Sequence, residues 1–183
     1  MSLQQHPRGR TVMRIGDFNA LDEGDARDLV SLWAAIPRWV TAVLAGRPYP
    51  TREALEETAA AEAATWDAAD LDQALAQHPR IGERREGDDP SATASRREQA
   101  AMTDAASDVA QRIAAGNTRY EARFGRVFLI RARGRSADEM LAELERRLAN
   151  TPESEVAEAA GQLAEIALLR LRESVSAERV ASG

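Results

Sequence analysis

The chain has 183 residues, a formal net charge of −6 and no cysteine, and all 24 of its basic residues are arginines. This length suits one domain with a single core, and the missing cysteine and lysine exclude disulfides, thiolate nucleophiles and Schiff-base catalysis. The negative charge disfavours a general nucleic-acid binder, and no apolar run approaches the roughly 20 residues that span a bilayer. We therefore expect a cytoplasmic protein with neither a nucleic-acid nor a membrane partner.

The N-terminal part predicts a tail followed by two short helices. Residues 1–16 are polar and contain glycine and proline, which is typical of a flexible tail. From Asp22 to Ala45 the apolar residues recur three or four apart, which predicts helix. Pro37 interrupts this pattern, so we expect two helices that meet at Ile36–Pro37.

Two further helix starts are marked by residues that cap helices. Thr51 follows the turn-forming "GRPYPT" and can cap the alanine-rich helix after it, and Asp67 can cap the next one. That next helix must end near His78, because the residue before a proline is disfavoured in the α conformation. A polar loop is expected over 80–94.

The second half of the chain begins with a long helical pattern, which runs from about Ser95 to Tyr120 with an expected break at Gly116–Asn117. The run "RVFLIRA" (126–132), here called the extended segment, is the only one rich in β-branched and aromatic residues. A lone run of this kind has no partner strand. We therefore expect it to be extended without forming a sheet.

The last two helices carry clear start signals. Ser136 and Glu139 match a capping box for a helix to about Ala149, and Thr151–Pro152 opens a final helix to about Val175. The fold class predicted is all-α, a single-domain bundle of about seven to nine helices with one short extended segment. Its domain spans 17–176, and 177–183 form a C-terminal tail.

Three ionisable residues occupy unusual places in these patterns, and each has two interpretations. Glu98 heads the apolar stripe of the long helix, where it can be a site residue or complete a capping box with Ser95. Arg170 continues the stripe of the final helix, where it needs a buried partner unless its guanidinium reaches solvent, and Arg172 must then face elsewhere. His78 can do chemistry or simply end a helix near the negative end of its dipole.

A metal site is not expected. Only one histidine lies within the predicted domain, there is no cysteine, and no two histidines have the spacing of metal ligands. The acidic "EGDDP" (86–90) also lacks the twelve-residue pattern of a calcium loop.

Five segments, taken in order, carry a resemblance to a known family. They are "FNALDEGDARDLVSLWAAIPRW" (18–39), "HPRIG" (78–82), "SRREQ" (95–99), "NTRYEARFGRVFLIRARG" (117–134) and "LRL" (169–171). Together they resemble the 2-oxo-4-hydroxy-4-carboxy-5-ureidoimidazoline (OHCU) decarboxylases of urate breakdown, over residues 17–175. One departure is Arg126, where family members often have an apolar residue; it bears on local packing rather than on chemistry.

The resemblance implies a cofactor-free, all-helical enzyme, often a homodimer, that converts OHCU to (S)-allantoin with loss of carbon dioxide. It assigns His78 as the catalytic acid/base, with Glu98 and Arg170 completing the polar site. It also implies that the extended segment lines the active site. The implied substrate-binding residues are Pro79, Ser95, Gln99, Ile130, Arg131 and Ala132, the last three through the backbone.

The chemistry of the residues agrees with this assignment. Loss of carbon dioxide leaves an electron pair that needs a sink, which a cofactor normally supplies. OHCU brings its own sink, a C=N bond next to the carbon that loses the carboxylate. The protein then has to orient the substrate, stabilise charge and deliver one proton, and histidine suits that delivery.

Two other functions remain open from the sequence. One is a helical binding module that kept the fold and lost the reaction, which the complete polar set disfavours. The other is an enzyme that acts on a related ureido-ring purine catabolite, and the sequence does not separate it from an OHCU decarboxylase.

Overall fold

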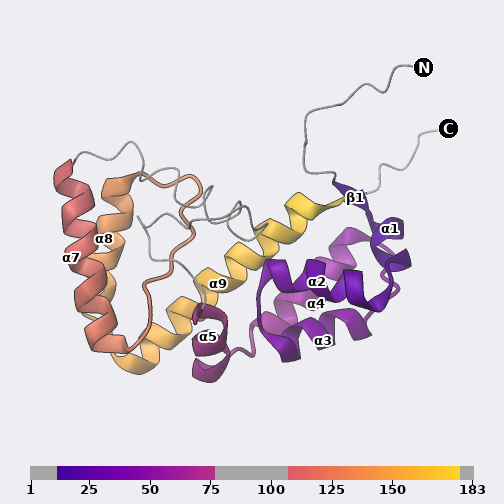
Figure 1. Ribbon diagram of the computed structural model, residues 1–183, viewed down its shortest axis with the longest axis horizontal. Helices are drawn as coiled ribbons and strands as arrows, with labels where there is room; N and C mark the ends of the chain where they lie inside the picture. Colours follow the sequence, from indigo (N-terminus) through magenta and orange to yellow (C-terminus); the bar gives the residue numbers. More distant parts are fainter. Residues whose placement is uncertain (1–11, 77–106, 178–183) are drawn as a thin grey trace, which may run out of the picture.

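The computed structural model describes residues 12–76 and 107–177, and these contain eight helices and one pair of short strands (Figure 1). In chain order the elements are β1 (Met13–Arg14), α1 (Ile15–Ala20), α2 (Glu23–Trp33), α3 (Pro37–Ala45), α4 (Arg52–Ala63), α5 (Ala68–Leu75), α7 (Ser107–Phe124), α8 (Ala137–Arg147), α9 (Pro152–Ser174) and β2 (Val175–Ser176). The predicted all-α class is confirmed. None of the helices in these two ranges is both long enough and apolar enough to cross a membrane.

The helices start where the capping residues predicted. Thr51, Asp67, Ser136 and Thr151 each accept a hydrogen bond from a backbone N–H two or three residues further on. These bonds satisfy N–H groups that have no partner within the helix. The chain also divides at Pro37, which is the first residue of α3, as predicted.

The predicted break at Gly116–Asn117 is wrong, because α7 continues through both residues to Phe124. Gly116 serves packing instead: a Cβ on it would lie 2.5 Å from Cδ2 of Leu144 in α8. The missing side chain lets α7 and α8 approach closely. The earlier part of the predicted helix, from Ser95, lies outside the described residues.

The predicted N-terminal tail is too long, since residues 13–16 belong to the fold. β1 pairs in parallel with β2, with Met13 opposite Val175 and Arg14 opposite Ser176, and the side chain of Ile15 is buried. This pairing joins the two ends of the chain. A local pattern does not reveal it, because its stabilising partner lies at the far end of the sequence.

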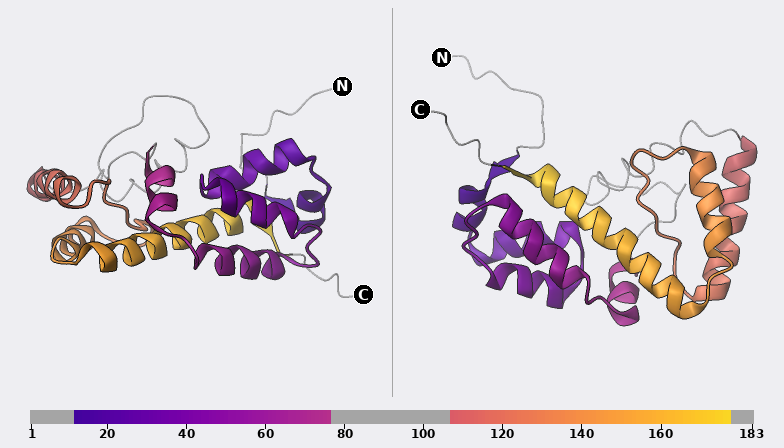
Figure 2. Two further views of the ribbon diagram at one scale, coloured as in Figure 1. Left: turned by 90° about the horizontal axis from the view of Figure 1, so that it is seen from below. Right: turned by 180° about the vertical axis from the view of Figure 1, so that it is seen from behind.

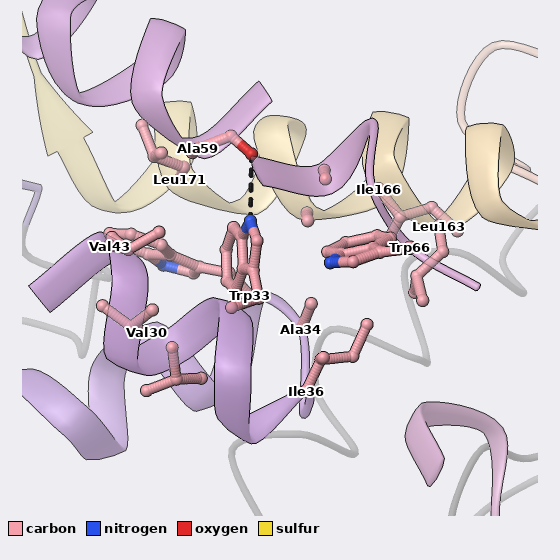
Figure 3. Packing of buried hydrophobic residues seen from close by; sticks show 14 of the residues in the cluster. Val30, Trp33, Ala34, Ile36, Val43, Ala59, Trp66, Leu163, Ile166 and Leu171 are labelled. Atoms are coloured by element: carbon pink, nitrogen blue, oxygen red, sulfur yellow. Dashed lines mark hydrogen bonds between the residues drawn. The ribbon is translucent and has the colours of Figure 1, made fainter. Parts of the chain in front are cut away.

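The first hydrophobic core lies between α9 and the helices α2 to α5 (Figure 3). Its three tryptophans are Trp33, Trp39 and Trp66, all at least nine-tenths buried. The indole N–H of Trp39 donates to the carbonyl of Ala59 at 2.9 Å. That of Trp33 donates to Oγ of Ser174 at 3.1 Å. These two hydrogen bonds link α3 to α4 and α2 to α9.

A second core lies between α7 and α8, at the end of α9 remote from β1 (Figure 2). Successive side chains of the extended segment point to opposite sides, and each side packs against a different core. Phe128, Ile130 and Ala132 belong to the second core, whereas Val127 and Leu129 pack against the first. Residues 127–132 form neither a helix nor, among the residues that the structure describes, a strand pair, as predicted.

Candidate active site

The residues predicted for the site fall into two groups. His78, Pro79, Ser95, Glu98 and Gln99 lie outside the described residues, so their roles stay predictions. Arg170, Ile130, Arg131 and Ala132 are described, on α9 and on the extended segment.

Arg170 lies partly buried on α9 and reaches the C-terminal end of α2. Its Nη1 is 3.3 Å from the carbonyl oxygens of Leu32 and of Trp33, to which it donates. The last carbonyls of a helix lack partners within it and form the negative end of its dipole. Ser174 adds a second link between α9 and α2, because its hydroxyl donates to the carbonyl of Arg170 and accepts from the indole of Trp33. The guanidinium therefore has polar partners and a defined position.

Arg172 lies on a different side of α9, as the helical register predicted. Its Nε is 2.7 Å from Oε2 of Glu56 on α4, and 53% of its side chain is exposed. Two arginines separated by one residue thus have different surroundings, which makes them a matched pair for mutagenesis.

The side chains of Ile130, Arg131 and Ala132 in the extended segment already have partners within the protein. The side chains of Ile130 and Ala132 are 2% exposed and lie in the second core. The guanidinium of Arg131 is bound at 2.7 Å by Glu165 of α9. The predicted contacts of these residues with substrate can therefore be made through the backbone.

Arg126, the departure from the family pattern, is accommodated by an ion pair. Its side chain is 12% exposed, and its Nε lies 3.0 Å from Oδ1 of Asp72 on α5. It also lines a cavity of about 390 Å³ together with Asp72, Leu75, Ala76, Glu121, Gly125 and Val127. The arginine thus links α5 to the start of the extended segment.

A buried polar network was missed by the sequence analysis. It consists of Tyr120, Arg147, Asn150 and Glu155, where α7, α8 and α9 meet. Arg147 and Glu155 have no exposed surface and form an ion pair, with Nε of Arg147 2.9 Å from Oε1 of Glu155. The Tyr120 hydroxyl donates to the same carboxylate, and Nδ2 of Asn150 donates to it at 2.8 Å.

Two further features define the environment of this network. The guanidinium of Arg147 lies 4.7 Å from the centroid of the Phe128 ring, a cation–π contact. Burial, together with the hydrogen bond to Glu155, raises the pKa of Tyr120 well above its ordinary value, so the hydroxyl remains a donor. A signal was present in the sequence: Arg147 follows Met140 and Leu144 at helical spacing, as Arg170 follows its own apolar stripe.

Within the two described ranges, no three histidine, aspartate or glutamate side chains are grouped so that they could hold a metal ion. The expectation of a metal-free site remains a prediction for the chain as a whole.

Comparison with known proteins supplies the family. The model of the OHCU decarboxylase family matches residues 19–172. The chain belongs to this family. A crystal structure of an OHCU decarboxylase in the presence of (S)-allantoin is similar to it with a TM-score of 0.65 and 26% identity, over 78% of this chain and 94% of that one.

A second crystal structure, of an (S)-allantoin synthase, is similar to this chain in fold. It has a TM-score of 0.67 and 17% identity, over 89% of this chain and 54% of that one. A search of curated protein sequences gave no match.

Proposed function

We propose that this protein catalyses the cofactor-independent decarboxylation of OHCU to (S)-allantoin in urate breakdown. The match of residues 19–172 to the OHCU decarboxylase family carries the proposal. The similarity to an OHCU decarboxylase crystallised in the presence of (S)-allantoin supports it.

The reaction needs no electron sink from the protein. As the bond to the carboxylate breaks, its electron pair moves into the adjacent C=N bond, which leaves carbon dioxide and an enamine-like intermediate. The ring nitrogen that receives the C=N electron pair takes up one proton, which balances the loss of carbon dioxide. The hydroxyl of the intermediate then gives up its proton and becomes a carbonyl as the neighbouring ring carbon gains a proton. The stereochemistry is set when a proton reaches the ring carbon of the former C=N bond, and in this proposal His78 delivers it. Glu98 holds the imidazole in one tautomer or binds a substrate N–H.

Arg170 orients the substrate in this mechanism. Its anchorage to the carbonyls of Leu32 and Trp33 limits the positions that its guanidinium can occupy. A tight grip on the departing carboxylate would stabilise the ground state and slow the reaction. We therefore place its substrate contact on a ring or ureido carbonyl.

The proposal is tested by circular dichroism while urate oxidase and the subsequent hydrolase generate OHCU. The protein should accelerate formation of (S)-allantoin, and this acceleration should survive exhaustive treatment with metal chelators, because the C=N bond of the substrate supplies the electron sink that a cofactor would otherwise provide. Binding of allantoin without acceleration would favour a non-catalytic module. Acceleration only with another ureido-ring compound would favour the related enzyme.

We also propose that the protein is a homodimer in the cytoplasm. Analytical ultracentrifugation tests whether two copies of the chain associate.

Arg170→Ala should lower kcat/KM for OHCU strongly, whereas Arg172→Ala should leave it near the wild-type value. A charge-assisted contact that orients substrate contributes roughly 2–4 kcal/mol, which corresponds to about 30- to 900-fold in rate. The Arg172 variant loses an ion pair in which Arg172 is half exposed, and Glu56 keeps Arg52 as a second partner. Circular dichroism spectra of both variants verify the fold. Equal losses in the two variants, or a larger loss for Arg172→Ala, would contradict the role of Arg170.

A further inference from the structure

Two peptide groups flank Ile130, one shared with Leu129 and the other with Arg131. Each of them forms a hydrogen bond with a side chain. Nη1 of Arg147 donates to the carbonyl of Leu129 at 2.7 Å, and the N–H of Arg131 donates to Oε1 of Gln162 at 2.9 Å. The first side chain comes from α8 and the second from α9. The extended segment is thus fixed by its backbone as well as by its buried side chains.

Planarity of the peptide bond turns these two contacts into a directional constraint. In a trans peptide the C=O and the N–H point in opposite directions. When Arg147 holds the carbonyl of Leu129, the N–H of Ile130 points away from Arg147. When Gln162 holds the N–H of Arg131, the carbonyl of Ile130 points away from Gln162. Among the described residues, none forms a hydrogen bond with either of these two groups of Ile130.

The support behind Arg147 is rigid. Its guanidinium is fully buried, paired with Glu155 and stacked near Phe128. A buried ion pair with further hydrogen bonds admits few alternative geometries, because each alternative leaves a charge without a partner. Gln162 is only partly buried, so its contact can be altered without disturbing that network.

We propose that Arg147 and Gln162 are positioning residues, which together aim the N–H and C=O of Ile130 at an amide edge of the substrate, either the ureido group or the ring N–H–C=O. One donor and one acceptor on a single residue match such an edge, as in strand-like recognition of a peptide. This inference rests on the proposed function.

The test compares three variants in α9. Gln162→Met removes the acceptor at similar length, Gln162→Glu restores an acceptor oxygen, and Glu165→Gln weakens the exposed ion pair one turn further on, which binds the side chain of the same Arg131. Gln162→Met removes the hydrogen bond between the Arg131 N–H and Gln162. This loss should raise both KM for OHCU and the Kd of (S)-allantoin about fivefold, with kcat and its pH profile little changed. Gln162→Glu should return both constants toward wild type, and Glu165→Gln should leave them unchanged.

Hydrogen exchange of the Arg131 amide reports whether the bond was lost. Faster exchange in Gln162→Met together with raised KM and Kd is the expected result. Faster exchange with unchanged KM and Kd, or an equal effect of Glu165→Gln, overturns the positioning role. Wild-type turnover of OHCU is measured first, because its absence contradicts the proposed function itself, whereas normal constants in Gln162→Met beside an active wild type contradict only this inference.

Discussion

Replacement of His78 by asparagine should abolish the acceleration of (S)-allantoin formation while leaving helicity and the thermal midpoint nearly unchanged. A positioned general acid or base contributes about 10²- to 10⁴-fold to a rate, and the asparagine amide keeps hydrogen-bonding capacity but does not exchange protons near neutral pH. The measurement is circular dichroism of the product with OHCU generated in the cuvette, alongside thermal unfolding of the variant.

The chain contains its own control for this experiment. "HPR" occurs at residues 6–8 as well as at 78–80, so His6→Asn makes the same change in the same tripeptide outside the matched family region. His6→Asn should retain full activity. Wild-type turnover in His78→Asn would refute the catalytic assignment and leave helix termination as the function of this histidine.

Arg147→Met should lower the free energy of unfolding by about 3–5 kcal/mol, because it leaves the carboxylate of Glu155 buried without its cation. The pair has no exposed surface, so water does not compensate for the lost partner. The carbonyl of Leu129 also loses its donor. Urea denaturation followed by far-ultraviolet circular dichroism measures the change.

Two comparisons distinguish this buried pair from charge in general. Arg146→Ala removes the neighbouring arginine, which is half exposed and paired with Glu143 and Glu158 at the surface, and it should cost at most about 1 kcal/mol. Adding Glu155→Leu to Arg147→Met should recover much of the loss, since an apolar replacement of both partners removes the stranded charge. A similar loss for Arg146→Ala and Arg147→Met would show that burial is not the cause.

Much of the secondary structure could be predicted because its signals are local. Thr51, Asp67, Ser136 and Thr151 cap helices through hydrogen bonds to residues two or three positions away, and Pro37 acts on its own turn. The failure at Gly116 has the opposite origin. A glycine weakens an isolated helix, but here it allows close contact with Leu144, and packing prevails over propensity.

The candidate site also combines features that the sequence could predict with features that it could not. The order and spacing of its motifs identified the family and assigned His78, Glu98 and Arg170 their expected roles, and helical periodicity alone separated Arg170 from Arg172. Helical periodicity did not provide the partners of these residues. That Arg170 meets the carbonyl end of α2 depends on the crossing of two helices far apart in the chain.

The sequence by itself determined the family, the all-α class and most helix starts, because capping, periodicity and residue order act within a few positions of the chain. Only the tertiary structure decided that Met13 and Arg14 pair with β2, that Glu155 and Arg147 form a buried ion pair, and that Arg147 also donates to the carbonyl of Leu129. The sequence does not reveal whether a charged side chain is solvated by water or paired with another charge. Which of the two occurs depends on the elements that enclose it, and these come together only when the chain folds.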